Sequence, residues 1–383
     1  MPSPINVLKT LAPPGARTAV GTRARPAVRR LIGLCAAAAL LAATIGGGSA
    51  ARAQIQGLAA FGDSLSEEYF ANGYSYAQSW FEQIHQHRGG IGGPYGVRGD
   101  TRGEGYEYNW SLWGASASQV HSIITNNLTT IQGQVTSGNV THAVLYAGTN
   151  DYGAWSDAYE RIYYGTWTQG QIDSYREGVV SEIRGAVEKL QGTGVSLVLS
   201  GVQDFGLGPF RLGNYDTFGD PARRQLVANA LSDFNDDLKA LALEKNIAFV
   251  DMLNFSYAVH GTHDAPNATL SVGGQNIQMT GAGTGATNAY VADRIHHHSV
   301  YQGLVANLFL EAFERQYNAG TPTFSEQEIV TNAGLAYGGD TLGIDLSQFV
   351  YTSVAIPEPG TLALLLPGCG ALWLLRRRIQ RSA

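Results

Sequence analysis

The chain has 383 residues, enough for one large domain or two smaller ones, and a formal net charge of −6. Residues 1–53 carry seven basic and no acidic residues, and residues 357–383 carry four arginines and one glutamate. The part between them holds 14 basic and 30 acidic residues, a net charge of −16, which argues against binding to nucleic acid or to an anionic membrane surface. Both cysteines, Cys35 and Cys369, lie in the end segments, so the middle has neither a disulfide framework nor a thiolate nucleophile.

Residues 1–53 have the pattern of a secretory signal peptide. A basic region that includes Arg29 and Arg30 is followed by an Ala- and Leu-rich apolar stretch, 31–45, and by the small-x-small exit Ala51-Arg52-Ala53. This order predicts export of the chain across the inner membrane.

The sequence Gly62-Asp63-Ser64-Leu65 follows an apolar run, 55–61, that predicts a short buried strand. Gly62 allows a sharp turn, and a serine between a strand and a helix can point its hydroxyl out of the carboxyl edge of the sheet, where open α/β sheets bind ligands. The nearby helix N-terminus would stabilise an oxyanion. A serine in this place can also simply cap a helix, so Ser64 is a candidate nucleophile or an N-cap.

The next segments alternate between predicted helix, loop and strand. Residues 74–85 predict a helix, residues 88–106 a Gly-rich loop, and residues 143–147 a central strand. Gly114 lies between that loop and the strand, in a second loop, where a glycine allows a tight turn or lets a backbone N–H approach a ligand. Asn150 comes just after the strand, where it can donate an N–H to an oxyanion or can belong to an ordinary turn.

Six aromatic residues are concentrated in residues 152–167, and they predict either a substrate cleft or packing beneath a long loop. Further along, residues 172–190 and 226–241 have the apolar spacing of helices, and residues 195–202 and 247–250 read as buried strands. This alternation predicts a parallel sheet that is covered by helices on both faces.

A hairpin is predicted from two short apolar runs, 270–272 and 277–279, on either side of Gly273-Gly274. Asp293-Arg294-Ile295-His296 follows and precedes a helix that includes residues 304–313. Residues 318–356 are rich in Gly and Thr, with weak periodicity, and predict an edge element or an extended link to the C-terminal segment.

Residues 357–383 contain Pro357-Glu358-Pro359, an apolar run over 361–375, and Arg376 to Arg378. As a helix the apolar run would rise only about 22 Å, so it would need flanking residues or a thinner bilayer to span a membrane. The order of the three parts resembles the PEP-CTERM sorting signal of Gram-negative bacteria. That resemblance implies transient anchoring in the membrane and processing by an exosortase. A plain tail anchor is the alternative.

Four blocks of the middle region occur in the order Ser64, Gly114, Asn150 and Asp293-x-x-His296, which resembles the SGNH (GDSL-type) hydrolase family over residues 54–317. The resemblance implies an α/β fold, a three-layer α/β/α sandwich with a parallel, flavodoxin-like sheet. It also implies that Ser64 is the nucleophile, His296 the base and Asp293 the residue that orients it. The oxyanion hole would be formed by the backbone N–H groups of Ser64 and Gly114 and by the side chain of Asn150. No metal or cofactor is implied.

The chain departs from the family pattern after His296, where His297 and His298 stand in place of the common proline. The three-residue spacing from Asp293 favours His296 as the base. A second interpretation is a metal-dependent hydrolase in which His296, His297 and His298 bind a metal. Three further residues would help in that case: His260, His263 and Asp264.

The sequence therefore predicts a secreted or surface-associated serine esterase or lipase with four parts: a signal peptide (1–53), a hydrolase domain (54–317), an extension or linker (318–356) and a sorting segment (357–383). Its expected substrate is an ester, either a small molecule or an O-acetylated polysaccharide. A non-catalytic surface or matrix protein on an esterase fold remains an alternative. The expected location is the cell surface, the extracellular space or the periplasm.

Overall fold

The computed structural model describes residues 54–96, 104–210 and 220–353, all of which fall within one compact unit. The predicted signal peptide and the predicted sorting segment lie outside the described residues. Within the described ranges, no helix combines the length and the apolar character needed to cross a membrane.

A five-stranded sheet forms the centre of the fold, in the order β1-β2-β3-β4-β8. Its strands are β1 (Leu58–Gly62), β2 (His142–Tyr146), β3 (Ser196–Ser200), β4 (Ala248–Val250) and β8 (Val350–Tyr351). The first four are parallel and almost completely buried, as their continuous apolar runs predict. The prediction of a parallel sheet is wrong only for β8, which pairs antiparallel with β4 at the edge.

The opposite edge of the sheet is extended by residues 108–112, which run beside β1. The amide of Ala60 donates to Tyr108 O (3.1 Å), and the amide of Trp110 donates to Ala60 O (2.8 Å). Asn109 and Ala60 form a parallel bridge. With this segment counted as the second strand in chain order, the parallel part has the 2-1-3-4-5 order of a flavodoxin-like sheet. The segment also leads Gly114 to the edge where Ser64 lies.

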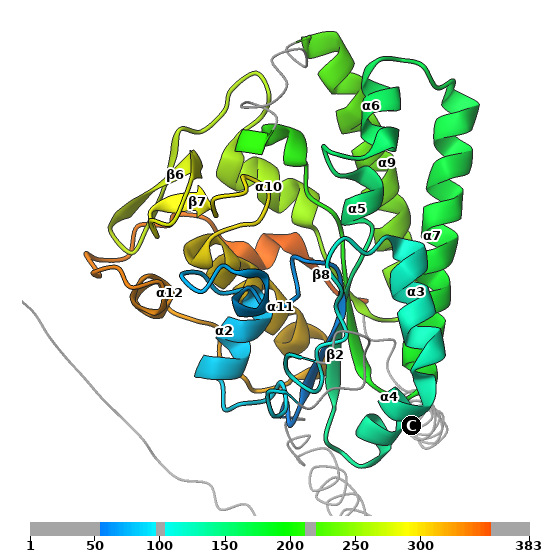
Figure 1. The fold of residues 1–383 in the computed structure, drawn as a ribbon, viewed down its shortest axis with the longest axis vertical. Helices are drawn as coiled ribbons and strands as arrows, with labels where there is room; N and C mark the ends of the chain where they lie inside the picture. The colour runs from blue at the N-terminus through cyan, green and yellow to red at the C-terminus, as the bar shows by residue number, and fades with distance from the viewer. Residues whose placement is uncertain (1–53, 97–103, 211–219, 354–383) are drawn as a thin grey trace, which may run out of the picture. The chain divides into compact units, whose positions relative to one another are not determined.

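Helices cover both faces of the sheet and make three layers (Figure 1). One face is covered by α11 (Ser299–Tyr317), with α2 (Trp80–His87) packed against it. The other face is covered by α3 (Ala117–Asn126), α7 (Gln169–Gly192) and α9 (Pro221–Glu244). The remaining helices of the described ranges are α4 (Leu128–Thr136), α5 (Thr149–Tyr152), α6 (Asp157–Tyr163), α10 (Met252–His260) and α12 (Glu326–Asn332), with short 3-10 turns at Phe70–Asn72, Phe205–Leu207 and Leu346–Phe349. The predicted three-layer α/β/α fold is confirmed.

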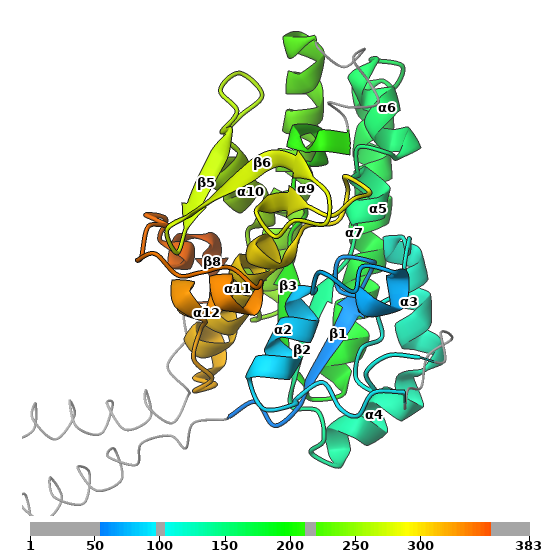
Figure 2. The ribbon, with the colours of Figure 1, turned by 60° about the vertical axis from the view of Figure 1, so that its left-hand side comes forward.

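A second, smaller sheet contains β5 (Thr269–Val272), β6 (Gln275–Ala282) and β7 (Asn288–Tyr290) (Figure 2). The predicted hairpin of β5 and β6 is confirmed, and Gly273 and Gly274 both have positive φ angles, 59° and 76°. Such angles at both central residues define the tight turn that twists in the same sense as its strands. Strand β7, which pairs parallel with β6, was not predicted.

Helix α2 begins at Trp80, six residues later than the sequence predicts. Ser79 caps it, since its side chain accepts a hydrogen bond from the Glu82 amide while the Glu82 carboxylate accepts one from the Ser79 amide. Residues 74–79 are therefore free to follow another path, and they bring Tyr74 to Asp293.

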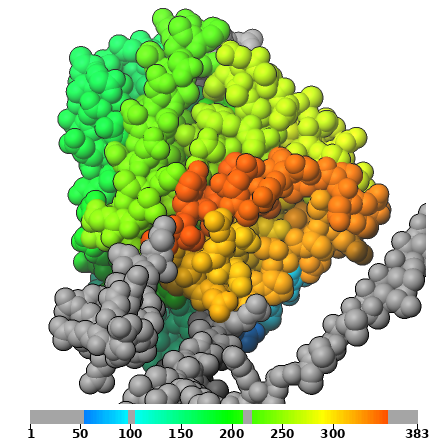
Figure 3. Space-filling view, turned by 180° about the vertical axis from the view of Figure 1, so that it is seen from behind, coloured from blue at the N-terminus to red at the C-terminus, as the bar shows by residue number. Residues whose placement is uncertain are grey.

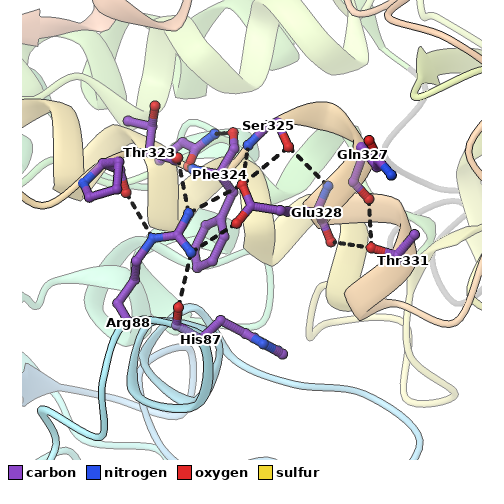
Figure 4. Close-up of polar contacts among 10 residues, drawn as sticks. His87, Arg88, Thr323, Phe324, Ser325, Gln327, Glu328 and Thr331 are labelled. Atoms are coloured by element: carbon purple, nitrogen blue, oxygen red, sulfur yellow. Dashed lines mark hydrogen bonds and ion pairs between the residues drawn. The ribbon is translucent and has the colours of Figure 1, made fainter.

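Residues 318–353 pack on the rest of the fold through α12 and β8, and from behind they form a continuous orange to red band (Figure 3). The guanidinium of Arg88 at the end of α2 holds this segment in place (Figure 4). It donates to both carboxylate oxygens of Glu328 (3.0 and 3.3 Å) and to the carbonyls of Pro322 (2.9 Å) and Thr323 (3.0 Å), and it lies 3.9 Å from the Phe324 ring centre. For residues 318–356 the sequence predicts either an edge element or an extended link, and the structure contains an edge strand there, β8.

Candidate active site

Ser64 lies two residues after the end of β1, in a tight turn rather than at the start of a helix. The Asp63 carboxylate accepts a hydrogen bond from the Leu65 amide (2.9 Å), and the Asp63 carbonyl accepts from the amides of Ser66 and Glu67. A Cβ atom at residue 62 would lie 2.4 Å from the Tyr146 carbonyl oxygen, so only glycine fits there. The expected helix N-terminus at Ser64 is therefore wrong, because the backbone closes a turn in its place.

The side chain of His296 reaches Ser64 from the other end of the chain. Nε2 of His296 lies 2.7 Å from Oγ of Ser64, and its Nδ1 is hydrogen-bonded to Oδ2 of Asp293. The other carboxylate oxygen of Asp293 accepts from the amides of Ile295 (2.8 Å) and His296 (3.0 Å). Arg294 has a φ of 69°, and this strained residue closes the turn that lets Asp293 and His296 meet.

The charge of Asp293 is maintained by its neighbours. Burial raises the pKa of this carboxyl, but the hydrogen bond and charge of His296, with the two backbone amides, outweigh it and hold the pKa of Asp293 below its usual value. A carboxylate in this place can hold the imidazole in one tautomer, with its Nε2 free to accept a proton from Ser64.

Gly114 and Asn150 lie beside Ser64, on the same cleft. Gly114 has a φ of 71°, a conformation that glycine adopts without strain. Asn150 belongs to the single turn α5 after β2, and its Nδ2 donates to Ala115 O (3.0 Å). All five residues proposed from the sequence as catalytic or oxyanion-binding are thus close together, at the carboxyl edge of the parallel strands.

The cleft has a volume of about 710 Å³, and its lining combines aromatic rings with hydroxyls and carboxylates. The rings of Trp113, Trp155, Trp167 and Tyr175 contribute to it, as do the polar residues Ser116, Asp151, Ser156 and Asp157. No lysine or arginine of the described ranges lines it. Both alternatives predicted for the aromatic run 152–167 therefore hold in part: Trp155 and Trp167 line the cleft, whereas Tyr152, Tyr159 and Tyr163 are buried in the core.

The two histidines after His296 point elsewhere. The ring of His297 stacks on Tyr301 with 3.8 Å between ring centres, and burial lowers the pKa of His297 well below its usual value. Nδ1 of His298 accepts a hydrogen bond from the Ser299 amide (2.8 Å) and caps α11. Of the three, only His296 contacts Ser64.

The residues of the metal-binding interpretation do not converge. His260 is buried beside the Tyr290 hydroxyl (3.2 Å), and His263 pairs with Asp204 (2.9 Å). His263 and Asp264 line a separate cavity of about 320 Å³ between α9 and α10. Over the described ranges, no group of three or more His, Cys, Asp or Glu side chains is arranged to hold a metal ion.

Three residues of the site were not found from the sequence. The Tyr74 hydroxyl donates to Oδ2 of Asp293 (2.9 Å). The rings of Trp113 and His296 are neighbours, with 4.4 Å between their centres. The indole N–H of Trp155 donates to Oδ1 of Asn150 (3.0 Å). Trp113 stands next to Gly114 and Trp155 lies in the aromatic run, so both were within segments already singled out. Tyr74 carried no such signal, because it was placed only at the start of the helix predicted over residues 74–85.

No model of a known protein family matches the chain, and no curated protein matches it. Among solved structures, an acetyl xylan esterase is 14% identical, with 67% of this chain and 98% of that one covered and a TM-score of 0.37. A GDSL-like lipase from Bacteroides thetaiotaomicron is 13% identical, with coverages of 68% and 88% and a TM-score of 0.37. A lipase from a goat rumen metagenome is 14% identical, with coverages of 73% and 97% and a TM-score of 0.38. The three-layer α/β/α arrangement therefore rests on the strand order and helix packing described above and not on these similarities.

Proposed function

We propose that this chain is a serine esterase that hydrolyses carboxylic esters at Ser64. The observation that supports this most directly is the 2.7 Å contact between Oγ of Ser64 and Nε2 of His296, whose other nitrogen is bound by Asp293. A nucleophile in hydrogen-bond reach of a base, with the base oriented by a third group, is the arrangement that activates a serine hydroxyl.

The reaction begins when Ser64 attacks the carbonyl carbon of the ester while His296 takes the hydroxyl proton. The negative charge that develops on the carbonyl oxygen is stabilised by the backbone N–H groups of Ser64 and Gly114 and by the side-chain N–H of Asn150. The intermediate collapses, His296 gives its proton to the leaving alcohol, and the acyl group remains on Ser64. Water, activated by His296, then releases the acid and regenerates the hydroxyl.

The lining of the cleft favours a neutral substrate. No basic side chain of the described ranges lines the cleft to bind a phosphate or carboxylate, and the carboxylate of Asp151 would repel one, whereas Asp157 is paired with Arg161. Aromatic rings beside hydroxyls and carboxylates suit the apolar face and the hydroxyl groups of a sugar. We therefore propose O-deacetylation of a polysaccharide as the activity that fits the cleft best, with lipase-like action on acyl esters as the other substrate class.

Export and anchoring are part of the same proposal. The predicted signal peptide, 1–53, would direct the chain across the inner membrane. The predicted sorting segment, 357–383, would hold it there until an exosortase-type enzyme removes the tail. The intact mass of protein recovered from outside the cytoplasm tests this, because removal of both ends shortens the chain to a core near residues 54–356, whereas full-length protein would contradict the processing.

The activity is tested with p-nitrophenyl esters of increasing acyl length and with an acetylated polysaccharide, for the wild type and for Ser64→Ala. Acetate release from the polysaccharide, lost in Ser64→Ala and unaffected by EDTA, is the expected result. Turnover that survives in Ser64→Ala and is abolished by EDTA would overturn the serine mechanism. A folded wild type without any turnover would leave a non-catalytic surface protein as the explanation.

A further inference from the structure

The side-chain amide of Asn150 is held from two sides. Its Nδ2 donates to the carbonyl oxygen of Ala115 (3.0 Å), and its Oδ1 accepts from the indole N–H of Trp155 (3.0 Å). Turning the amide over would place two donors against each other at the indole and two acceptors against each other at the carbonyl. The two contacts therefore permit a single orientation of the amide.

That orientation leaves one donor available. An asparagine amide carries two N–H bonds, and one of them is used at Ala115. Asn150 lines the cleft together with Ser64, so the second N–H is the one that a substrate carbonyl oxygen can accept. The indole N–H also withdraws electron density through Oδ1, which strengthens the amide as a donor.

The indole of Trp155 is itself fixed by packing. A Cβ atom at Gly153 would lie 2.6 Å from the Trp155 ring, so the chain carries a glycine where the ring passes over the backbone. The ring of Phe205 meets the indole edge-on, with 4.9 Å between ring centres. Trp155 is thus a rigid donor rather than a mobile side chain of the cleft wall.

We propose that Trp155 is a positioning residue for oxyanion stabilisation. Its indole N–H holds the Asn150 amide so that the remaining N–H faces the carbonyl oxygen of an ester attacked by Ser64. This inference rests on the proposed function, because it assigns Trp155 a role in that reaction. A residue that acts through Asn150 should affect the turnover number, kcat, and should have no effect once Asn150 is gone.

Trp155→Phe keeps an aromatic ring and removes the N–H. We expect kcat to fall about tenfold with little change in KM, less than the ~10²–10³-fold loss expected for Asn150→Ala, in which the donor itself is removed. Trp167→Phe is the matched comparison, because Trp167 lines the same cleft but its ring packs against Tyr175, with 5.2 Å between ring centres. Its effect, whatever its size, should fall mainly on KM.

A double-mutant cycle decides the question. In the Asn150→Ala background, Trp155→Phe should no longer change kcat, whereas Trp167→Phe should have the same effect as in the wild type. An equal loss from Trp155→Phe in both backgrounds would overturn the inference and make Trp155 a wall of the cleft only. Activity retained in Ser64→Ala would instead overturn the proposed function, so the two failures are distinguishable.

A second variant guards against loss of packing. Replacing Trp155 with 3-benzothienylalanine keeps the shape of the two-ring system and substitutes sulfur for the N–H. This protein should unfold at the wild-type temperature and show the same loss of kcat as Trp155→Phe. Full activity in this variant would show that the N–H does not position Asn150.

Discussion

The phenol of Tyr74 donates a hydrogen bond to Oδ2 of Asp293, 2.9 Å away, and this is the same oxygen that is bound by Nδ1 of His296. Burial and the adjacent carboxylate raise the pKa of Tyr74, so the phenol keeps its proton and acts as a donor. Its ring lies 5.9 Å from the imidazole of His296. Tyr74 therefore fixes the carboxylate that orients the proposed base.

Tyr74→Phe should lower kcat about three- to tenfold with little change in KM, because a hydrogen bond to a charged group contributes ~1.5–3 kcal/mol and only part of it is lost at the transition state. Steady-state kinetics on p-nitrophenyl acetate measure this. Tyr76→Phe is the control, since its hydroxyl accepts from the Ala292 amide (3.2 Å) and does not touch Asp293. Equal losses in the two variants would mean that the hydroxyls only support the turn.

The neighbouring histidines should separate by function. His296→Ala should lower kcat by ~10³-fold or more, because it removes the imidazole that is hydrogen-bonded to the Ser64 hydroxyl. His297→Ala should keep kcat within a factor of about three but lose ~2–4 kcal/mol of stability, since it empties a buried stacking position against Tyr301. Kinetics and urea unfolding of both variants provide the measurements. An inactive but stably folded His297→Ala would show that His296 is not the base and that the assignment is wrong.

Asp63 should make the stability depend on pH. Burial raises the pKa of Asp63 to about 7, against the lowering effect of the Leu65 amide and the Thr149 hydroxyl. The folded protein then binds this proton more tightly than the unfolded chain does. The resulting stabilisation is complete below the ordinary carboxyl pKa, near pH 4, and is lost as the pH rises through about 7.

Asp63→Asn removes this titration while its side-chain oxygen can still accept from Leu65. The free energy of unfolding of the wild type, relative to the variant, should fall by at most roughly 4 kcal/mol between pH 4 and pH 8. Urea unfolding at several pH values gives this difference directly. A difference that stays constant with pH would show that Asp63 does not carry the proton.

The segment after α11 should contribute to stability through Arg88. Arg88→Lys keeps the charge but loses the planar contact with Phe324 and the paired hydrogen bonds to Glu328, so we expect a loss of ~1–2 kcal/mol. Arg184→Lys, which changes a more exposed pair with Glu244, should cost under about 1 kcal/mol. Thermal unfolding compares the two, and equal effects would contradict an integral role for residues 318–353.

Much of the fold followed from local patterns in the chain. The apolar runs that became β1, β2, β3 and β4 are short and continuous because these strands are buried on both faces, and the long helices between them carry clear periodicity. The weaker elements depend on distant partners. Strand β8 has two residues and exists only beside β4, while the 108–112 segment is extended only because it lies along β1.

The site followed from the sequence to a similar extent. Ser64, Gly114, Asn150, Asp293 and His296 were predicted because their types and order resemble the SGNH (GDSL-type) hydrolase family, and the places of Ser64 and Asn150 just after predicted strands agree with a site at the edge of a sheet. Tyr74 and Trp155 could not be assigned in this way, since their roles depend on single hydrogen bonds across 219 and 5 residues of chain, respectively. The helix predicted at Ser64 was wrong because the Asp63 side chain closes a turn.

The most direct test of the account is covalent labelling of the folded protein with a fluorophosphonate, followed by peptide mapping and residual activity. We predict one label per chain, on Ser64, with hydrolysis lost in proportion to labelling. The His296→Ala variant should be labelled much more slowly than the wild type. Labelling of another residue, or full hydrolytic activity in protein that is completely labelled at Ser64, would contradict it.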